Sequence, residues 1–550
     1  MLALGRSFAS LRMRNQLELS FSHLTSHRSL LTSHLSMIPV ITPEQSNSWD
    51  RRAADAGIGL ATLMESAGRA AATVLADRYG HLLRDGVLVA AGPGNNGGDG
   101  FVIARALHRA DVPVWVASAG IGSELREHVA QQARVDGVRE VSPDGPWPTV
   151  GLAVDALLGT GAAGAPRPGV AALLERILDL DVPVAAIDGP TGVDLLTGTV
   201  HGVTRADLTL TFGGFRRGHL LARDEVGDLV VLDIGHPSPD PDWPLVVSDS
   251  QAAVWVRGLR ARDHKGDRGR VVVVGGESGM SGALRLAGRA AFGAGAGLVH
   301  AVAPAETVSA LVQAEPDLQT MIHSFDQLPT AELLDLVAKA DAVVIGPGLG
   351  RDPNRRAFIM ALLDVAKAAV LDADALVAFA GAATELRTLA GARPIVLTPH
   401  PGEFRTLFPA LASTRELDPW AAASAAARET GTTILLKGVP TVVASRRRQP
   451  LTVVAGNPGL ATGGSGDVLS GLVGTNLAAG LEPEFAAALG AQLLGRSADL
   501  AARRYTARGL RPMDVVLALP DLWREWEILR GAGSALRPPV LFELPRPETT

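Results

Sequence analysis

A glycine-rich stretch in the first half of the chain, Gly92-Pro-Gly-Asn-Asn-Gly-Gly-Asp-Gly100, is the first group of residues with an evident chemical use. It follows an apolar run and precedes a helix-like segment, so its backbone N–H groups and the helix N-terminus favour phosphate binding. Residues 92–97 also match G-x-G-x-x-G. In dinucleotide-binding enzymes the next strand ends in an acid that binds the ribose, whereas here that strand ends at Ser118. The dehydrogenase interpretation fails, and the polar residues of this stretch need another role.

Two aspartates lie at the ends of apolar runs in the same half. Asp155 stands within one run, before Gly159-Thr-Gly161, and Asp188 directly follows another. Ligands of parallel α/β sheets bind beyond the carboxyl ends of strands, so these groups should converge on the first glycine stretch. Amide, carboxylate and Thr191 oxygens would suit an alkali or alkaline-earth ion, and Asp188 is the candidate general acid or base. Ordinary turns with helix-capping aspartates are the alternative, but three such clusters together favour a site.

The second half carries its most informative motif at Gly463-Gly-Ser-Gly-Asp467, where a helix-like segment begins. Consecutive N–H groups there would bind an anion, and Asp467 could accept the proton of a hydroxyl that attacks a phosphate. Lys437, one of only four Lys in the chain, ends an apolar run. His400 lies between two prolines. It either donates to a substrate phosphate or is a solvent-exposed turn residue, and both interpretations stay open.

Short apolar runs alternate with helix-like segments in both halves, which predicts an α/β fold with mostly parallel sheets covered on both faces. A helical pattern from Thr42 to Tyr79 comes first, and a helix is predicted at 101–109. The predicted strands are 87–91, 112–118, 151–158, 182–188, 208–212 and 229–233 in the first half, and 271–275, 298–302, 342–345, 369–372, 395–398 and 433–436 in the second.

Proline-rich sequence sets the predicted domain boundaries. Residues 237–248 contain four prolines and no periodicity, which predicts a linker. The two domains would then span 37–236 and 249–525. The tail, 526–550, is also rich in proline, and we expect it to fray after about Arg530.

The composition excludes several classes of function. At 550 residues the chain is too long for one ordinary core, and the absence of Cys excludes disulfides, thiolate catalysis and thiolate zinc sites. The net charge of -6 gives no electrostatic case for binding nucleic acid or an anionic membrane, and no run reaches the roughly 20 apolar residues of a membrane span. We expect a cytoplasmic homo-oligomer. The extra segment 1–36 favours disorder or a start assigned upstream of Met37 over a transit peptide.

The three clusters of the first half resemble the NAD(P)H-hydrate epimerase family, and the match covers residues 38–235. The resemblance implies a Rossmann-like parallel-sheet sandwich, proton transfer by Asp188, and a potassium ion at Asn96, Asp155 and Thr191. It also implies substrate contacts at Asn95, Asn96, Gly97, Gly98, Asp99, Gly159, Thr160, Gly161, Ala162, Ala163, Gly164, Ala165 and Asp188.

The sequence departs from this family at two places. The family usually has Ser where Thr191 stands, but the hydroxyl is kept. It also usually has Lys near residues 212–218, where this chain has Arg216 and Arg217. Because Lys and Arg differ in geometry, no role is assigned to this region.

The Gly-Gly-x-Gly-Asp helix start resembles the ribokinase-like superfamily. The motifs at 398–403 and 437–441 narrow the resemblance to the ADP/ATP-dependent NAD(P)H-hydrate dehydratases, across residues 250–525. A ribokinase-like α/β domain is implied, with Asp467 as the base and Mg²⁺ bound with ADP. Substrate contacts are implied at Ala283, Gly348, His400 and Asp467, and nucleotide contacts at Lys437, Gly438, Val439, Pro440, Thr441 and Gly466.

Together the two resemblances imply repair of hydrated nicotinamide nucleotides, NADHX and NADPHX. The first domain would interconvert the R and S hydrates, and the second would dehydrate the S hydrate with ADP, releasing AMP and phosphate. One alternative is a kinase that phosphorylates a vitamin alcohol and releases a stable ester. The other is that the first half is only a nucleotide-binding partner domain.

Overall fold

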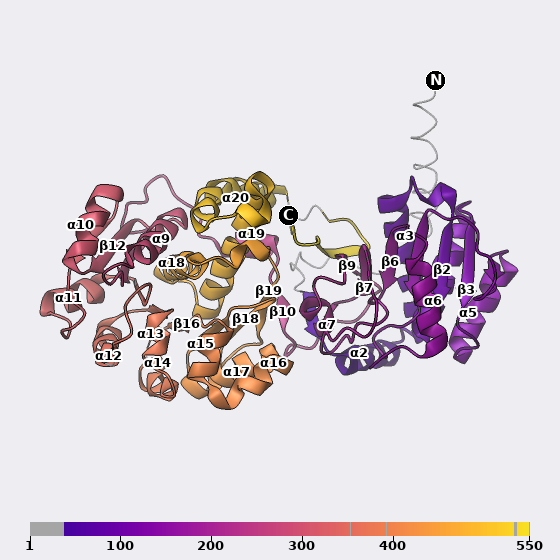
Figure 1. The fold of residues 1–550 in the computed structure, drawn as a ribbon, viewed down its shortest axis with the longest axis horizontal. Helices are drawn as coiled ribbons and strands as arrows, with labels where there is room; N and C mark the ends of the chain where they lie inside the picture. Colours follow the sequence, from indigo (N-terminus) through magenta and orange to yellow (C-terminus); the bar gives the residue numbers. More distant parts are fainter. Residues whose placement is uncertain (1–37, 353, 392, 533–535, 549–550) are drawn as a thin grey trace, which may run out of the picture. The chain divides into compact units, whose positions relative to one another are not determined.

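The computed structural model describes residues 38–352, 354–391, 393–532 and 536–548 (Figure 1). Its contacts divide the chain into two compact units, the first ending at Trp243 and the second beginning at Pro244. This division falls within the predicted linker, 237–248. The segment that ends at Arg546 belongs to the first unit, although it follows the second in sequence. The expectation for residues 1–36 lies outside the described residues.

The first unit is built on an eight-stranded sheet in the order β20-β9-β7-β6-β5-β2-β3-β4. Its neighbouring strands are parallel, except that β20 is antiparallel to β9. The six strands predicted in this half are confirmed with small differences at their ends, whereas β4 and β20 are absent from the prediction. The strands are β2 (Val87–Ala91), β3 (Val114–Ser118), β4 (Arg139–Val141), β5 (Leu152–Ala156), β6 (Val184–Ile187), β7 (Leu208–Phe212), β9 (Asp228–Leu232) and β20 (Val540–Leu544).

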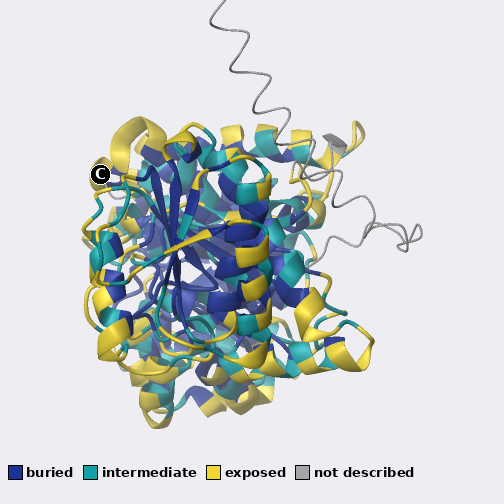
Figure 2. Cartoon of the chain, turned by 90° about the vertical axis from the view of Figure 1, so that its right-hand side faces the viewer, coloured by how far each residue is buried: buried dark blue, intermediate teal, exposed yellow. Residues whose placement is uncertain are grey.

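Helices cover both faces of this sheet. On one face α3, α4 and α5 pack against Val87, Val89 and Ala91, and on the other α6 packs against Leu88 and Ala90. Figure 2 shows the buried strands of this unit between helices with exposed outer surfaces. The remaining elements are β1 (Ile38–Ile41), α2 (Pro43–Asp55), α3 (Leu60–Tyr79), η1 (Leu83–Asp85), α4 (Asn95–Arg109), α5 (Glu124–Val135), α6 (Pro168–Leu178), β8 (Phe215–Arg216), which pairs with β1, and α7 (Arg217–Leu221).

The first helical pattern forms two helices rather than one. Thr42 caps α2 through a capping box with Gln45, which confirms the predicted start. The helix ends at Asp55, and α3 begins only at Leu60. Between them Gly57 adopts a φ of 90°, a backbone conformation that interrupts a right-handed helix.

The glycine-rich stretch also differs from the prediction, because α4 begins at Asn95 and not at residue 101. Only Gly92–Gly94 form the turn after β2. The physical reason is close packing: a Cβ on Gly97 would lie 1.9 Å from the carbonyl oxygen of Gly92. Glycine at position 97 lets the first turn of the helix lie directly against the end of the strand. This places Asn96 at the carboxyl edge of the sheet.

The expectation that the chain frays after Arg530 is wrong for the C-terminal strand. Helix α20 extends to Ala532, and β20 pairs with β9 from Leu229 to Leu232. The sequence of β20, Val-Leu-Phe-Glu-Leu, is rich in residues that favour strands, and proline is confined to its flanks. The prolines therefore delimit a strand instead of preventing one.

The second unit contains a mixed sheet in the order β13-β12-β11-β14-β15-β16-β17-β18-β19-β10. Strands are parallel from β13 to β17, and β18 is antiparallel to both of its neighbours. All six predicted strands are confirmed. The strands are β10 (Leu245–Val246), β11 (Arg270–Val274), β12 (Leu298–Ala303), β13 (Gln319–Ile322), β14 (Ala342–Ile345), β15 (Ala369–Leu371), β16 (Ile395–Leu397), β17 (Thr433–Leu436), β18 (Thr441–Ala444) and β19 (Leu451–Val453).

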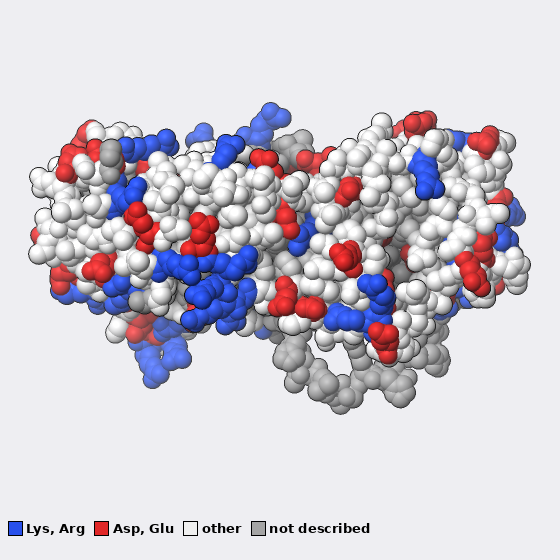
Figure 3. Space-filling view, turned by 90° about the horizontal axis from the view of Figure 1, so that it is seen from below, with Lys and Arg blue, Asp and Glu red and all other residues white. Residues whose placement is uncertain are grey.

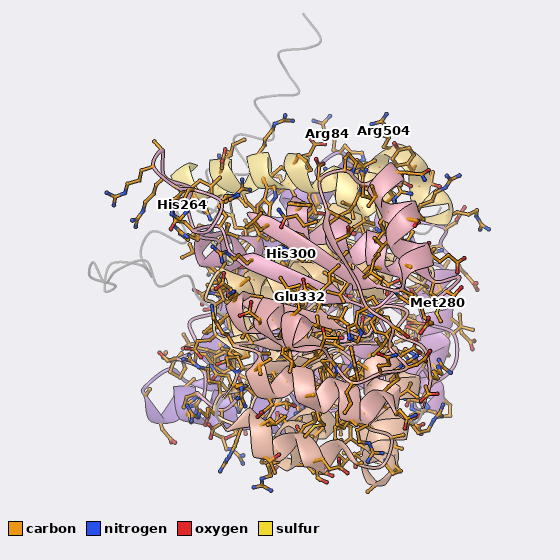
Figure 4. All side chains as sticks on the ribbon, turned by 90° about the vertical axis from the view of Figure 1, so that its left-hand side faces the viewer. Arg84, His264, Met280, His300, Glu332 and Arg504 are labelled. Atoms are coloured by element: carbon orange, nitrogen blue, oxygen red, sulfur yellow. The ribbon has the colours of Figure 1, made fainter. Side chains whose placement is uncertain are left out.

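The loops of interest in this unit follow the strands. His264, which precedes β11, and Met280, which follows it, are labelled on opposite sides of Figure 4. The helices are α8 (Asp249–Trp255), α9 (Ser281–Gly293), α10 (Ala305–Ala314), α11 (Ala331–Lys339), α12 (Arg355–Val365), α13 (Asp374–Val377), η2 (Ala383–Leu386), α14 (Arg387–Ala390), α15 (Pro401–Leu407), η3 (Pro409–Leu411), α16 (Ala412–Leu417), α17 (Pro419–Thr430), η4 (Pro458–Leu460), α18 (Ser465–Ala478), α19 (Pro483–Gly509) and α20 (Pro512–Ala532).

The surface charge is unevenly distributed. On the face drawn in Figure 3, Lys and Arg gather over one part of the second unit, at the left, while acidic side chains are scattered. In the described part of the chain, no helix is both long enough and apolar enough to cross a membrane.

Candidate active sites

A cavity of about 570 Å³ opens in the first unit at the carboxyl ends of its central strands. Gly97 and Gly98 do not line it, since both are buried and Gly98 packs against Met64. The other substrate-contact residues implied by the sequence all do. These are Asn95, Asn96, Asp99, Gly159, Thr160, Gly161, Ala162, Ala163, Gly164, Ala165 and Asp188.

Asp188 occupies a strained position directly after β6. Its φ is 63°, in the left-handed region that non-glycine residues rarely adopt. One carboxylate oxygen, Oδ2, accepts hydrogen bonds from the backbone N–H of Thr160 at 2.6 Å and from the Thr160 hydroxyl. A Cβ on Gly159 would lie 2.9 Å from the same oxygen. The loop after β5 therefore closes directly over the carboxylate.

Two residues that the sequence analysis left without a role hold Asp188 from the other side. The Arg216 guanidinium lies 3.3 Å from Oδ1 of Asp188 and donates to the Thr160 hydroxyl at 3.0 Å. His219 is fully buried, and its Nε2 lies 2.6 Å from the backbone oxygen of Asp188. Its Nδ1 accepts from the backbone N–H of Arg216 at 3.1 Å, which fixes the neutral tautomer with the proton on Nε2.

The charge state of these groups follows from their surroundings. Burial acts to raise the pKa of Asp188, but the Arg216 guanidinium and the Thr160 hydrogen bonds bring that pKa below its ordinary value. Burial lowers the pKa of His219 to about 4. At neutral pH the site thus contains an ionised Asp188, a cationic Arg216 and a neutral His219.

Asp99 faces the same cavity in the opposite state. Burial, followed by the negative charges of Asp188 and Asp50, raises its pKa well above the ordinary value of 3.8. Two carboxyl groups in one cavity therefore have pKa values that are pushed apart. Such a separation allows one group to act as a base and the other as an acid.

Oxygen-rich groups lie beneath this cavity. Asp155 is buried and accepts hydrogen bonds at 2.8 Å from both the backbone N–H and the hydroxyl of Thr191. Leu158 donates its backbone N–H to the Thr191 hydroxyl, and the next residue, Gly159, lies against Asn96. Both polar atoms of the buried Asn96 side chain lack a hydrogen-bond partner.

The side-chain oxygens of Asn96, Asp155 and Thr191 fit a monovalent cation. An unpartnered buried amide is costly unless something binds it, and the amide oxygen of Asn96 is a hard ligand. Among the described residues, no three His, Asp or Glu side chains are grouped to hold a metal. A cation here would therefore be bound by neutral oxygens and the single carboxylate of Asp155.

In the second unit Lys437, at the end of β17, is surrounded by acids. Its Nζ donates to Oδ1 of Asp372 at 2.8 Å and lies 3.8 Å from Oε2 of Glu403. Burial acts to lower the pKa of Lys437, but Asp372 and Glu403 raise it above its ordinary value. A Cβ on Gly466 would lie 3.4 Å from this Nζ, so the lysine packs directly against the first turn of α18.

Asp467 lies in that first turn, as the sequence predicts. Burial and then the charge of Asp372 raise its pKa to about 7, although Lys437 opposes the shift. A carboxyl group with this pKa is suited to accept a proton near neutral pH. Asp372, which follows β15 and is almost fully buried, is a functional candidate that the sequence analysis did not name.

The structure also places the remaining predicted residues of this unit. His400 is exposed and caps α15, because its Nδ1 accepts from the backbone N–H of Gly402 at 3.0 Å. Its Nε2 lies 3.4 Å from Oε1 of Glu403. The turn interpretation is therefore confirmed, and substrate binding by His400 stays a prediction. Gly348 has a φ of 61°, and a Cβ there would lie 3.5 Å from that of Ala283. Residues 437–440 form the turn between β17 and β18, and Thr441 is the first residue of β18.

Two family models match the chain. The model for the N-terminus of YjeF-related proteins matches residues 60–218, and the model for NAD(P)H-hydrate dehydratase matches residues 271–521. Each match coincides with one of the two sets of motifs described above.

Similar proteins match along most of the chain. The bifunctional NAD(P)H-hydrate repair enzyme Nnr of Escherichia coli strain K12 is 36% identical over 481 residues, 86% of this chain and 91% of that protein. The repair enzyme of Leishmania major is 34% identical over 511 residues, 85% and 90% of the two chains. A solved ADP/ATP-dependent NAD(P)H-hydrate dehydratase from Bacillus subtilis, co-crystallised with ATP and Mg²⁺, aligns at 25% identity with a TM-score of 0.44, over 51% of this chain and 97% of that chain.

In each unit, buried acids lie beside a cationic side chain at the carboxyl ends of parallel strands, where α/β proteins bind their ligands. The fold and the two sites therefore define a two-domain α/β enzyme. Since its relatives match over nearly their whole length, the chain belongs to the family of bifunctional NAD(P)H-hydrate repair enzymes. This confirms the predicted family and does not favour the vitamin-kinase alternative.

The burial of neutral His219 predicts a loss of stability in acid. The unfolded chain takes up a proton below the ordinary pKa of 6.5, whereas the folded chain does so only near 4. The first unit should therefore lose about 3 kcal/mol of stability as the pH falls from 6.5 to 4. Hydrogen exchange of first-unit peptides in urea measures this, and His219→Gln should flatten the slope. Identical slopes for the variant and the parent would contradict the assignment.

Proposed function

We propose that the first unit interconverts the R and S hydrates of NADH and NADPH, and that the second unit dehydrates the S hydrate with ADP, releasing AMP and phosphate. The observation that carries the proposal is that each unit has a carboxyl group prepared for proton transfer: Asp188 ionised in its cavity, and Asp467 with a pKa of about 7 at a glycine-lined helix start. The relatives, named repair enzymes, support the choice of substrate.

The first reaction is a proton-transfer problem. In the hydrated ring the C6 carbon bears a hydroxyl and the ring nitrogen, so loss of the hydroxyl proton opens the ring and reclosure from the other face inverts the centre. Asp188, held ionised by Arg216, takes the hydroxyl proton. Asp99, whose pKa is raised, supplies the proton that the ring nitrogen needs as it leaves. Asn95 and the loop 159–165 line the cavity around the nucleotide.

The second reaction needs a better leaving group than hydroxide. Asp467 accepts the proton of the C6 hydroxyl while that oxygen attacks the terminal phosphate of ADP and AMP leaves. The C6–O bond then breaks, phosphate departs, and a proton is lost from C5 to the departing phosphate, which restores the dihydropyridine ring. Lys437 and the N–H groups beside Gly466 stabilise the phosphate charge. Mg²⁺ bound with the nucleotide would neutralise the same charge, chiefly through phosphate oxygens. Ala283, Gly348 and His400 contact the substrate, and residues 438–441 contact the nucleotide.

A potassium ion in the first unit is part of the proposal. Asn96, Asp155 and Thr191 supply oxygen ligands, and the unpartnered Asn96 amide supports their role. When bound, the ion fixes the loop after β5 that covers Asp188. We also propose cytoplasmic location and assembly into homo-oligomers.

The division of labour predicts opposite effects for two isosteric substitutions. Asp188→Asn should reduce R-to-S conversion by at least about a thousandfold and leave dehydration of the S hydrate unchanged, because a neutral amide cannot accept a proton. Asp467→Asn should reduce dehydration of the S hydrate by a similar factor and leave R-to-S conversion unchanged. Recovery of reduced-nicotinamide absorbance from the S hydrate with ADP and Mg²⁺ measures dehydration, and chromatographic separation of the R and S hydrates without ADP measures their interconversion. A stable phosphorylated product from the parent chain would favour a kinase instead.

Dehydration should depend on pH through Asp467. Its pKa of about 7 predicts that kcat/KM for the S hydrate falls tenfold per unit below pH 7, since the protonated acid cannot act as a base. Asp372→Asn should move this limb to lower pH, because Asp372 raises the pKa of Asp467. Asp335→Asn, on the exposed surface of α11, is the matched control. An unchanged limb in the Asp372 variant would show that another group titrates.

Potassium should stabilise the first unit. At equal ionic strength, KCl should raise the thermal midpoint of this unit above its value in LiCl, because an ion that binds only the folded state stabilises it by mass action. Asp155→Asn should abolish the difference, which hydrogen exchange of residues 152–161 also reports. Equal midpoints in both salts for the parent chain would exclude the site.

A further inference from the structure

Residues 539–546, near the C-terminal end of the described chain, bind the first unit. Strand β20 pairs with β9, the backbone N–H of Asp233 donates to Pro539 at 2.7 Å, and that of Arg546 donates to Asp228 at 2.8 Å. The Arg546 guanidinium also donates to the carbonyl of Ala206 at 2.8 Å. Figure 1 shows this strand, in yellow, beside β9. The segment is therefore the edge strand of the first sheet.

The same segment supplies acceptors to a buried arginine. Arg223, which follows α7, is 8% exposed, and burial lowers its pKa to about 10. Its guanidinium donates to Gly227 at 2.7 Å, to Leu544 at 3.2 Å and to Pro545. Two of these three carbonyls belong to the C-terminal segment. Without them a buried cation would lose most of its hydrogen bonds, which is strongly destabilising.

A second contact reaches the chain just before α7. Phe542 of β20 packs edge-on against Phe215, with ring centroids 5.6 Å apart at 79°. Phe215 is fully buried and directly precedes Arg216. The C-terminal segment therefore contacts residues 215–223 at both ends, at Phe215 and at Arg223.

Between these two contacts lie Arg216 and His219, the residues that hold Asp188 in place. Arg216 contacts the Asp188 carboxylate, and its guanidinium is fixed further by the carbonyls of Phe212 and Gly214 at 3.2 and 2.8 Å. His219 holds the Asp188 backbone. A shift of residues 215–223 would therefore move both partners of the carboxylate at once.

We propose that the C-terminal segment, residues 536–546, is a positioning element of the first active site, which holds Arg216 and His219 against Asp188 from the far end of the chain. The proposal rests on the function proposed above for Asp188. It adds that R-to-S conversion requires a strand encoded after the entire second unit. Dehydration by the second unit does not depend on that strand.

A chain that ends at residue 536 tests the proposal. Its kcat for R-to-S conversion should fall about 10- to 100-fold, the loss expected when catalytic groups are misplaced by about 1 Å. KM should change less, because the cavity walls at residues 95–99 and 159–165 remain. Dehydration of the S hydrate, measured on the same preparation, should stay within about twofold. A synthetic peptide of residues 537–548 should restore the conversion by adding a strand to β9.

Point substitutions in the full chain separate positioning from folding. Phe542→Ala should lower kcat for conversion and speed hydrogen exchange of residues 213–223, whereas Phe542→Leu should restore most of both. Glu543→Gln is the control and should leave both unchanged, because the Glu543 side chain is 40% exposed and its ion pair with Arg78, at 3.3 Å, is a weak surface interaction.

The outcomes are distinct. Full conversion by the shortened chain, equal loss of both activities, or unchanged exchange of residues 213–223 would overturn the proposal. A full-length chain that fails to convert the R hydrate would refute the proposed function instead. In that case the hydrogen-exchange comparison still decides whether the C-terminal segment positions Arg216 and His219.

Discussion

A carboxylate buried at the end of a parallel strand, with one cation beside it, is the interaction on which both units depend. Asp188 follows β6 and faces Arg216; Asp372 follows β15 and faces Lys437. A buried charge is tolerated only when it is paired and hydrogen-bonded, so each pair constrains the loops around it. Both strand ends also carry left-handed backbone, at Asp188 with a φ of 63° and at Ala373 with a φ of 50°. Such strain persists only where the surroundings enforce it.

The two pairs have different chemical consequences. In the first unit the buried acid is itself the reactive group, and Arg216 keeps it ionised while the nearby Asp99 has a raised pKa. In the second unit the pair lies behind the reactive group: the charge of Asp372 helps to raise the pKa of Asp467 to about 7. In each unit burial and the charge of a neighbouring carboxylate raise the pKa of a second carboxyl group: Asp188 acts on Asp99, and Asp372 acts on Asp467. A buried carboxylate beside a cationic side chain is therefore the reactive group of the first site, whereas in the second site it is the neighbour of the reactive group.

Local sequence was sufficient for six strands in each half and for the polar residues that follow them, but it did not identify β4, β10, β13, β18, β19 or β20. Apolar runs bounded by glycine identified the six strands of each half, and polar residues beyond them marked Asn96, Asp188 and Asp467. Arg216 and His219 were not assigned because their function depends on a contact with a loop far away in sequence. Asp372 was accessible in principle, since it is the last residue of a predicted strand, as Asp188 is. The helical start at Asn95 depends on the contact of Gly97 with Gly92, which no periodicity reveals.

The first unit can include a strand that follows the second unit in sequence because β20 lies at the edge of its sheet. It pairs at the edge of the sheet, outside β9, and the central strands β2, β5 and β6 are consecutive partners that precede the second unit. The core between these strands and their helices can therefore form before the end of the chain exists. Only the pairing of β9 with β20 and two of the hydrogen bonds of Arg223 require the C-terminal segment. Until β20 pairs with it, the edge of β9 is unpaired and open to association with other chains, and β20 then takes its place as the edge strand.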